Sequence, residues 1–293
     1  MGKLLDKIKV NKIFISKLLF ILFIYVFLFS FFENVKGELD REQEIKTDKD
    51  GDGLSDYFEE HISLTNPRIP NYRYVILIDP LHIPIFKKQK FKIYETPVSK
   101  IAKFLNLKEK IPSENIIKLE GNKATIYNFK EALFKIARKA NKNDFVFLFF
   151  ISHGEKGKIF LYKESLSYEK LNKWLDEIHV RAIIIGIHAC YSGSAIKFLK
   201  SGKSPRVIFT SSSENQTSIP HHPTREFFKA FEEPESYLFA DIKLGDRNGY
   251  VSTKEAFLYA KRKMERITDS ITPQLSDPQN ISQFLYLGEY VPE

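Results

Sequence analysis

Short apolar runs alternate with amphipathic segments along most of the chain. Runs that are apolar at nearly every position, as over residues 72–79, 145–152 and 181–189, predict strands with both faces buried. Apolar residues three or four positions apart predict helices over 97–107 and 125–140. The same patterns predict strands at "ENIIKLEG" and "RVIFTSSS", and helices over 167–178, from Gly193 onward, at "TREFFKAFEE" and at "TKEAFLYAKRKMERI".

Strands that alternate with helices of 10–16 residues indicate one fold class. The expected architecture is an α/β fold with a mostly parallel central sheet covered by helices on both sides. Residues between the strand at 145–152 and the helix at 167–178 are expected to form a loop. We find no internal repeat and no low-complexity tract.

Charge changes this picture only at the N-terminus. The chain has 293 residues, is 43% hydrophobic and carries a formal net charge of +8. Residues 1–36 hold six lysines against Asp6 and Glu33, so half of the net charge lies there. The remainder has no clustered run of Lys and Arg, which excludes nucleic acid as an expected partner.

The same N-terminal residues read as a targeting segment. Five lysines precede "LLFILFIYVFLFSFF", fifteen uncharged residues that end at Phe32. This pattern is typical of a signal peptide, although counting from Ile13 gives the length of a membrane-spanning helix. Two alternatives stay open: a cleaved signal, or an uncleaved anchor that attaches the protein to a membrane. Either places the rest of the chain outside the cytoplasm, secreted or at the cell surface.

The only cysteine follows a predicted strand, and so does a histidine. Cys190 comes directly after the run at 181–189, and His153 directly after the run at 145–152. Parallel strands place their carboxyl ends at one edge of a sheet, where ligand sites form. Taken singly, each residue is more often structural, but together they predict a nucleophile and its acid or base. The N–H groups of Gly154 and Cys190 are candidates for an oxyanion hole.

These motifs resemble a known group of enzymes. "SHG" and "HACYSGS" at successive strand ends are similar to the motifs of the legumain, caspase and gingipain clan of cysteine peptidases, most closely to its legumain-like branch. The resemblance covers residues 72–259 and implies a caspase-like three-layer sandwich. It implies Cys190 as the nucleophile and His153 as the general acid and base.

The resemblance also implies a specificity pocket. It places His188 at a pocket-lining position and matches "TSSSENQTS" to the segment that lines the pocket, with Ser212, Ser213 and Glu214. The sequence departs from legumains after the first strand, where Asp79 stands. Asp79 is therefore only a possible orienter of His153, and a preference for cleavage after Asn does not carry over. An arginine in the pocket would suit an acidic residue, and Arg73, Arg206 and Arg225 are the three candidates.

An acidic loop upstream has the spacing of an EF-hand. In "DKDGDGLSDYFE" oxygen side chains occupy positions 1, 3, 5, 9 and 12, and Gly53 occupies position 6. Alternate carboxylates at this spacing converge on a hard cation, so we expect calcium. A solvated acidic linker is the alternative. The expected ligands are Asp48, Asp50, Asp52, Leu54 through its carbonyl, Asp56 and Glu59.

A second, weaker match is "LGDRNGYVSTKE". Leu244 stands where the first carboxylate belongs. We therefore expect a tight turn in which Ser252 caps a helix and Glu255 completes a capping box, rather than a metal site.

Three parts are expected: residues 1–36 as signal or anchor, 37–70 as the calcium-binding segment and linker, and 71–293 as the peptidase domain. The expected function is an exported cysteine endopeptidase acting on protein or peptide substrates, with no cofactor needed for the chemistry. Two alternatives remain. A transamidase would use the same pair of residues with an amine as acceptor, and a calcium-dependent surface-binding protein would use an inactive scaffold.

Overall fold

The computed structural model describes residues 47–81, 96–219, 222–268 and 270–292. The signal or anchor expected over residues 1–36 lies outside these residues. Among the helices that the structure describes, none has the length and apolar character needed to cross a membrane.

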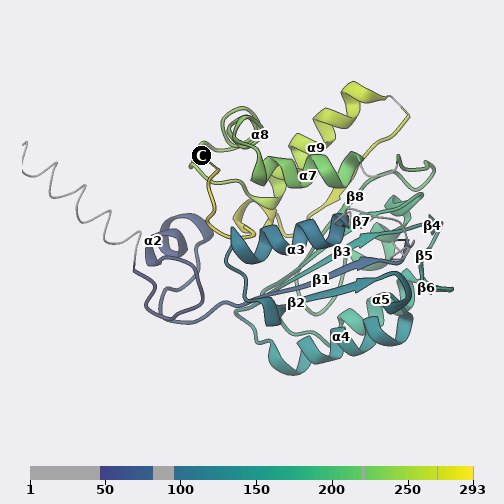
Figure 1. Ribbon diagram of the computed structural model, residues 1–293, viewed down its shortest axis with the longest axis horizontal. Helices are drawn as coiled ribbons and strands as arrows, with labels where there is room; N and C mark the ends of the chain where they lie inside the picture. The colour runs from purple at the N-terminus through teal and green to yellow at the C-terminus, as the bar shows by residue number, and fades with distance from the viewer. Residues whose placement is uncertain (1–46, 82–95, 220–221, 269, 293) are drawn as a thin grey trace, which may run out of the picture.

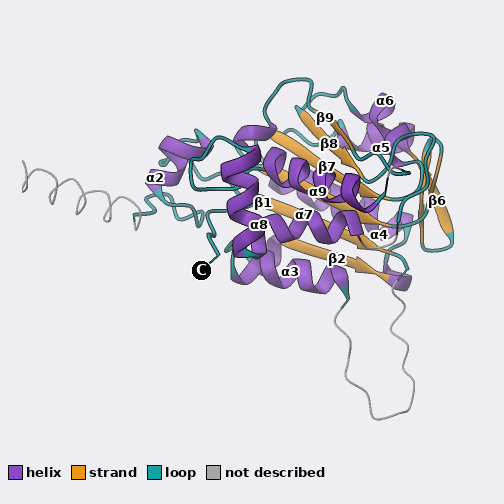
Figure 2. Ribbon diagram, turned by 90° about the horizontal axis from the view of Figure 1, so that it is seen from above, coloured by secondary structure: helices purple, strands orange, loops and turns teal. Residues whose placement is uncertain are grey.

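A six-stranded sheet forms the centre, in the order β2-β1-β3-β7-β8-β9 (Figure 2). The first five strands are parallel, and β9 pairs antiparallel with β8. The strands are β1 (Arg73–Asp79), β2 (Ile116–Glu120), β3 (Phe145–Ile151), β7 (Ala182–His188), β8 (Arg206–Thr210) and β9 (Gln274–Ser276).

Helices cover both faces of the sheet, as expected for strands that are apolar throughout (Figure 1). One face packs against α4 (Ile126–Lys139), α5 (Tyr168–Leu175) and α6 (Ile196–Leu199). The other packs against α3 (Pro97–Leu107), α7 (His222–Glu232), α8 (Pro234–Phe239) and α9 (Thr253–Ile267). The predicted three-layer α/β sandwich with a mostly parallel sheet is thereby confirmed.

A hydrophobic core lies on each face of the sheet. Successive residues of the central strands pack alternately into one core and the other, because side chains alternate across a strand. In β3, Leu148 and Phe150 join the core under α4 and α5, while Phe147 and Phe149 join the core under α7 and α9. All of these side chains are at most 4% exposed.

One expectation was wrong. The residues after β3 form a second, three-stranded antiparallel sheet instead of a loop: β4 (Gly154–Glu155), β5 (Lys158–Leu161) and β6 (Glu164–Ser167). A two-residue turn at Lys156 and Gly157 joins β4 to β5, and Gly157 adopts a left-handed φ of 81°. Ile159 and Leu161 are buried and alternate with more exposed residues, but the sequence does not show this alternation because Phe160 is apolar as well.

The acidic segment forms a short unit at the start of β1. Its loop leads into α2 (Asp56–Phe58), which continues as a π-helical turn over Glu59–Ser63. In Figure 1 this unit lies at the end of the sheet opposite to β4, β5 and β6.

Candidate active site

The pairing of β3 with β7 brings His153 and Cys190 level with each other. Ile151 pairs with His188, and the N–H of Ser152 donates to the carbonyl of His188 at 2.9 Å. If the register continues for two more residues, His153 lies level with Cys190. His153 is exposed and Cys190 is partly buried, so both are within reach of a substrate.

Gly154 holds the two chain segments close together. A Cβ atom at this position would lie 2.5 Å from the carbonyl oxygen of Cys190 and 3.0 Å from Cβ of Ala189. The N–H of Phe160 donates to the carbonyl of His153, so these two form the hydrogen-bonded pair of the β4–β5 ladder. In an antiparallel ladder, hydrogen-bonded residue pairs alternate with pairs that are not hydrogen-bonded. Gly154 and Ile159 form a pair of the second kind, so the N–H of Gly154 points away from β5.

The chain turns sharply after Cys190. Tyr191 has a φ of 56°, a left-handed conformation that is uncommon for a bulky residue. Its N–H donates to the carbonyl of Gln216 at 2.7 Å, and the N–H of Ala189 donates to Oγ of Ser211 at 3.2 Å. The N–H groups on either side of Cys190 therefore have internal partners.

The loop after β8 supports this turn. Oγ of Ser212 donates to the carbonyl of Ala189 at 3.1 Å, and the N–H of Ser192 lies 3.3 Å from the same Oγ. A Cβ atom on Gly193 would lie 2.7 Å from the nitrogen of Glu214, so the two loops are in direct contact. Ser212 is fully buried, Ser213 is partly buried and Glu214 is exposed. Ser212 thus holds the turn, and of these three residues only Ser213 and Glu214 remain open to solvent.

The same loop reaches the sulfur atom. The N–H of Ser218 lies 3.4 Å from Sγ of Cys190, and Oγ of Ser218 donates to Oγ of Ser211 at 2.8 Å. Sequence patterns contain no signal for this contact, because a main-chain N–H is present at almost every residue.

His188 is buried beneath the site, with 6% of its surface exposed. Its Nε2 lies 3.0 Å from the carbonyl of Ile219, which only accepts, so Nε2 carries a proton. Its Nδ1 lies 2.5 Å from Oγ1 of Thr224. His188 also lines a small, mainly apolar cavity with Phe149, Phe209, Phe227, Thr210, Ser211 and Thr224. It joins the loop after β8 to α7.

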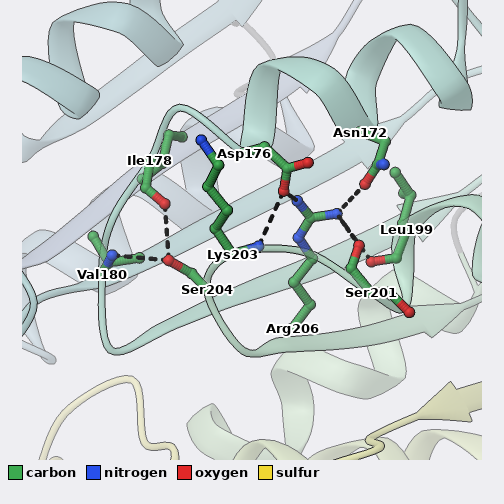
Figure 3. A network of polar contacts seen from close by, with 9 residues as sticks. All are labelled: Asn172, Asp176, Ile178, Val180, Leu199, Ser201, Lys203, Ser204 and Arg206. Atoms are coloured by element: carbon green, nitrogen blue, oxygen red, sulfur yellow. Dashed lines mark hydrogen bonds and ion pairs between the residues drawn. The ribbon is translucent and has the colours of Figure 1, made fainter.

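The three arginines do not all lie at the same edge of the central sheet. Arg73 and Arg206 are the first residues of β1 and β8, at the amino ends of the strands, and both are buried. Arg206 forms an ion pair with Asp176 at 2.7 Å and donates to the carbonyls of Leu199 and Ser201 (Figure 3). Arg225 follows Thr224 on α7 and has an exposed side chain paired with Glu226. Arg225 is therefore the one of the three at the carboxyl edge.

Asp79 ends β1 and is fully buried. Ile78 pairs with Phe150, so Asp79 is level with Ile151, two residues before His153. Its Oδ1 accepts a hydrogen bond from the N–H of Leu81 at 3.0 Å.

The structure brings part of the expected calcium loop together. Ligand atoms of Asp48, Asp50 and Asp52 lie within 4.8 Å of one another. Asp56 instead forms an ion pair with Lys49, at 2.5 Å. The side chain of Leu54 is buried and packs with Phe58.

Burial and like charges act on these acids. Burial, followed by the neighbouring carboxylate of Asp52, raises the pKa of Asp50 to about 6. Burial, followed by the charges of Asp52 and Asp50, raises the pKa of Glu59 to about 7. Glu59 is therefore electrostatically coupled to the aspartates.

The second acidic loop has the predicted capping box. Oγ of Ser252 accepts from the N–H of Glu255, and the Glu255 carboxylate accepts from the N–H of Ser252 at 2.7 Å. Ligand atoms of Asp241, Asp246 and Glu255 also lie within 4.8 Å of one another. Sequence spacing missed Asp241, because it precedes the loop motif.

Comparisons with known proteins place the chain in a family. No curated protein matches it. Among solved structures, protein GSU0716 from Geobacter sulfurreducens is 14% identical, with a TM-score of 0.49, and the match covers 75% of this chain and 98% of that one. Caspase-1 from Spodoptera frugiperda is 13% identical, with a TM-score of 0.49, and the match covers 75% and 91%.

Residues 85–233, just over half of the chain, match the peptidase C13 family. The matched stretch begins after β1, contains His153, Gly154 and Cys190, and extends through α7. The chain therefore belongs to the peptidase C13 family of legumain-like cysteine peptidases.

Proposed function

We propose that the chain is an exported cysteine endopeptidase that hydrolyses peptide bonds through Cys190 and His153. The observation that supports this most directly is the shared register of β3 and β7, with the Gly154 backbone against the Cys190 carbonyl. A thiol and an imidazole held level at the carboxyl edge of a parallel sheet suit nucleophilic attack on a carbonyl.

In the first step, Sγ of Cys190 forms a bond to the peptide carbonyl carbon, and its proton passes to His153. The oxyanion is held by the N–H groups of Gly154 and Cys190. The C–N bond then breaks, and His153 returns the proton to the leaving amine. A thioester remains on Cys190.

In the second step, His153 takes a proton from water, and the hydroxide oxygen bonds to the thioester carbon. The C–S bond breaks and the thiolate is restored, with a carboxylic acid as product. The main-chain N–H of Ser218, 3.4 Å from Sγ, supports the thiolate at the start and end of the cycle.

Substrate selection falls to the loop after β8 and the start of α7. Ser213 and Glu214 lie next to the Gly193 turn, and Arg225 lies on the same edge of the molecule. The edge carries a hydroxyl, a carboxylate and an arginine that is paired with Glu226, so the peptide panel should include polar and charged residues before the scissile bond.

Export remains part of the proposal and rests on the basic, apolar N-terminal sequence. An uncleaved segment would hold the protein at a membrane, and a cleaved one would release it. Immunodetection of the N-terminus in membrane and medium fractions distinguishes these two forms.

The test uses acyloxymethyl-ketone peptides that differ in the residue before the reactive group. Intact-mass spectrometry of the full chain in mild detergent measures the adducts. We expect one adduct per chain, no adduct with Cys190→Ala, and labelling slowed at least a hundredfold with His153→Ala. Labelling no faster than that of a free thiol, unchanged by His153→Ala, would contradict the proposal.

A transamidase would pass the labelling test, because it differs only in the acceptor. Product analysis with a peptide substrate, with and without added hydroxylamine, separates the two. Carboxylic acid as the main product at low amine concentration supports the peptidase.

A further inference from the structure

Three aspartate side chains meet in the loop before β1. Asp48, Asp50 and Asp52 have ligand atoms within 4.8 Å of one another. Backbone N–H groups shape the loop around them: Gly51 donates to Asp48 at 2.7 Å and Leu54 donates to Asp52 at 2.9 Å. Acidic clusters are common on protein surfaces, so this grouping alone does not define a site.

The second observation is a set of buried oxygen atoms without partners. Among the residues that the structure describes, Oδ2 of Asp50, Oε2 of Glu59 and Oδ1 of Asn71 are buried and accept no hydrogen bond. Glu59 is 0% exposed and Asn71 is 2% exposed. A buried acceptor without a donor is costly unless a cation fills the role.

Asn71 connects Glu59 to the aspartates. Its N–H donates to Oδ2 of Asp52 at 2.8 Å, and its Nδ2 donates to Oε1 of Glu59 at 2.6 Å. Asn71 is therefore held between a loop aspartate and Glu59, and its buried amide oxygen accepts no hydrogen bond. The raised pKa values of Asp50 and Glu59 agree with this crowding of carboxylates.

We propose that Asp48, Asp50, Asp52, Glu59 and Asn71 bind one calcium ion. All five offer oxygen, and Ca²⁺ prefers six to eight oxygen ligands in flexible geometry. The set differs from the sequence expectation at three residues, because Asn71 is added and Leu54 and Asp56 are left out. Asn71, from outside the loop, joins it, while the Asp56 carboxylate is occupied by Lys49.

The bound ion would fasten the acidic segment to the domain. The guanidinium of Arg73 donates to the carbonyl of Asp52 at 3.4 Å and to the carbonyl of Leu287 at 2.9 Å. Oγ of Ser55 donates to Glu289 at 2.7 Å. The loop thus contacts the C-terminal stretch through two independent polar links.

Aromatic contacts also hold the acidic segment against the rest of the domain. The ring of Phe58 packs edge-on against Tyr250 at 4.9 Å and against Tyr286 at 5.3 Å between ring centres. These contacts lie at the amino end of β1, whereas Cys190 lies beyond the carboxyl end of β7. Calcium is therefore expected to stabilise the fold without entering the chemistry.

The experiment titrates the full chain, in mild detergent and stripped of metal, with Ca²⁺ alone or Mg²⁺ alone. Equilibrium dialysis measures binding, and thermal unfolding measures stability. We expect saturable Ca²⁺ binding that raises the unfolding midpoint by roughly 5–10 °C at a hundredfold excess over Kd. Mg²⁺ at the same concentration should give less than half of that shift.

Variants test the ligand set. Asp50→Asn and Asn71→Ala should each weaken Ca²⁺ binding at least tenfold, while the matched control Asp56→Asn should change it less than threefold. Asp50 is partly exposed, so Asp50→Asn remains informative if Asn71→Ala does not fold. Absence of saturable binding, or wild-type affinity in both Asp50→Asn and Asn71→Ala, would overturn the proposal.

The site and the proposed peptidase are tested separately. The rate at which the acyloxymethyl ketone labels Cys190 at 10 °C should change less than twofold between metal-free and calcium-loaded protein. A tenfold change would overturn the assignment of a purely stabilising role.

Discussion

The main-chain N–H of Ser218 lies 3.4 Å from Sγ of Cys190. This contact joins the loop after β8 to the residue at the end of β7, and the neighbouring hydroxyl contact between Ser218 and Ser211 fixes its direction. The sulfur therefore has a hydrogen-bond donor supplied by the backbone of a loop that is distant in sequence.

Removing that donor should slow the reaction of the thiol. Ser218→Pro deletes the N–H, and a lost hydrogen bond to a charged acceptor costs about 1.5 kcal/mol, or roughly tenfold in rate. The measurement is alkylation of Cys190 by iodoacetamide at neutral pH. Ser218→Ala, which keeps the N–H, should react within threefold of wild type. Equal loss in both variants would assign the effect to the hydroxyl instead.

Gly154→Ala should abolish most activity while leaving the fold intact. The added Cβ would be placed 2.5 Å from the Cys190 carbonyl, so the strand ends must move apart. A displacement of about 1 Å at a catalytic pair typically costs about a hundredfold in rate. Labelling with the acyloxymethyl ketone measures this loss.

The control lies in the same hairpin. Gly157→Ala introduces a side chain at a φ of 81°, with Phe198 as its nearest neighbour at 3.9 Å. It should lower the free energy of unfolding by about 1 kcal/mol and leave labelling within threefold of wild type. Similar activity loss in the two alanine variants would show that hairpin strain, and not crowding at Cys190, is responsible.

Glu109 should make stability depend on pH. Burial raises the pKa of this carboxyl from 4.5 to about 7, although the N–H of Tyr290 and the charge of Arg73 act in the opposite direction. The folded chain therefore holds a proton that the unfolded chain releases between pH 4.5 and 7. Its contribution is fully present below pH 4.5 and is lost as the pH rises through about 7.

Glu109→Gln removes this dependence, because the amide does not titrate. Urea unfolding with calcium present should show that the free-energy difference between Glu109→Gln and wild type grows by about 2 kcal/mol from pH 5 to pH 8 in favour of the variant. A difference that is constant across this range would contradict the raised pKa.

Arg206 should stabilise the fold without affecting the chemistry. Its guanidinium is buried at the amino end of β8 and contacts Asp176, Asn172 and two carbonyls (Figure 3). Arg206→Met leaves those acceptors unpaired, and breaking such a buried pair costs about 3–5 kcal/mol. Urea unfolding at 10 °C measures the loss.

Labelling of the Arg206→Met protein that remains folded at 10 °C should stay within threefold of wild type. A changed preference among the ketone peptides would contradict the position of Arg206, because only a pocket residue alters selection.

Sequence patterns predicted the main elements well, because fully apolar strands and amphipathic helices differ clearly in period. Thr125 caps α4 as expected, and α3 and α9 have the predicted bounds. The β4–β6 hairpins were missed because their strands have only two to four residues. Runs this short give little periodic signal.

The candidate site was likewise predicted only in part from the sequence. His153 and Cys190 were predicted as a pair from strand-end positions, and the strands that they follow are neighbours with Ile151 level with His188. The Ser218 contact, the left-handed Tyr191 and the approach of Asn71 to Glu59 depend on tertiary arrangement. The composition of a short segment does not specify which distant loop packs against it.

The direction and length of β1 determine whether the effects of variants at its two ends are independent. This strand begins at Arg73, beside the acidic loop, and its seven residues extend about 20 Å toward the edge that holds His153 and Cys190. Mutational free energies at sites farther than about 10 Å apart usually add. In a double variant such as Asp50→Asn with Ser218→Pro, the change in the free energy of unfolding should therefore equal the sum of the changes in the two single variants. Thermal stability and thiol reactivity are then separately adjustable properties of this molecule.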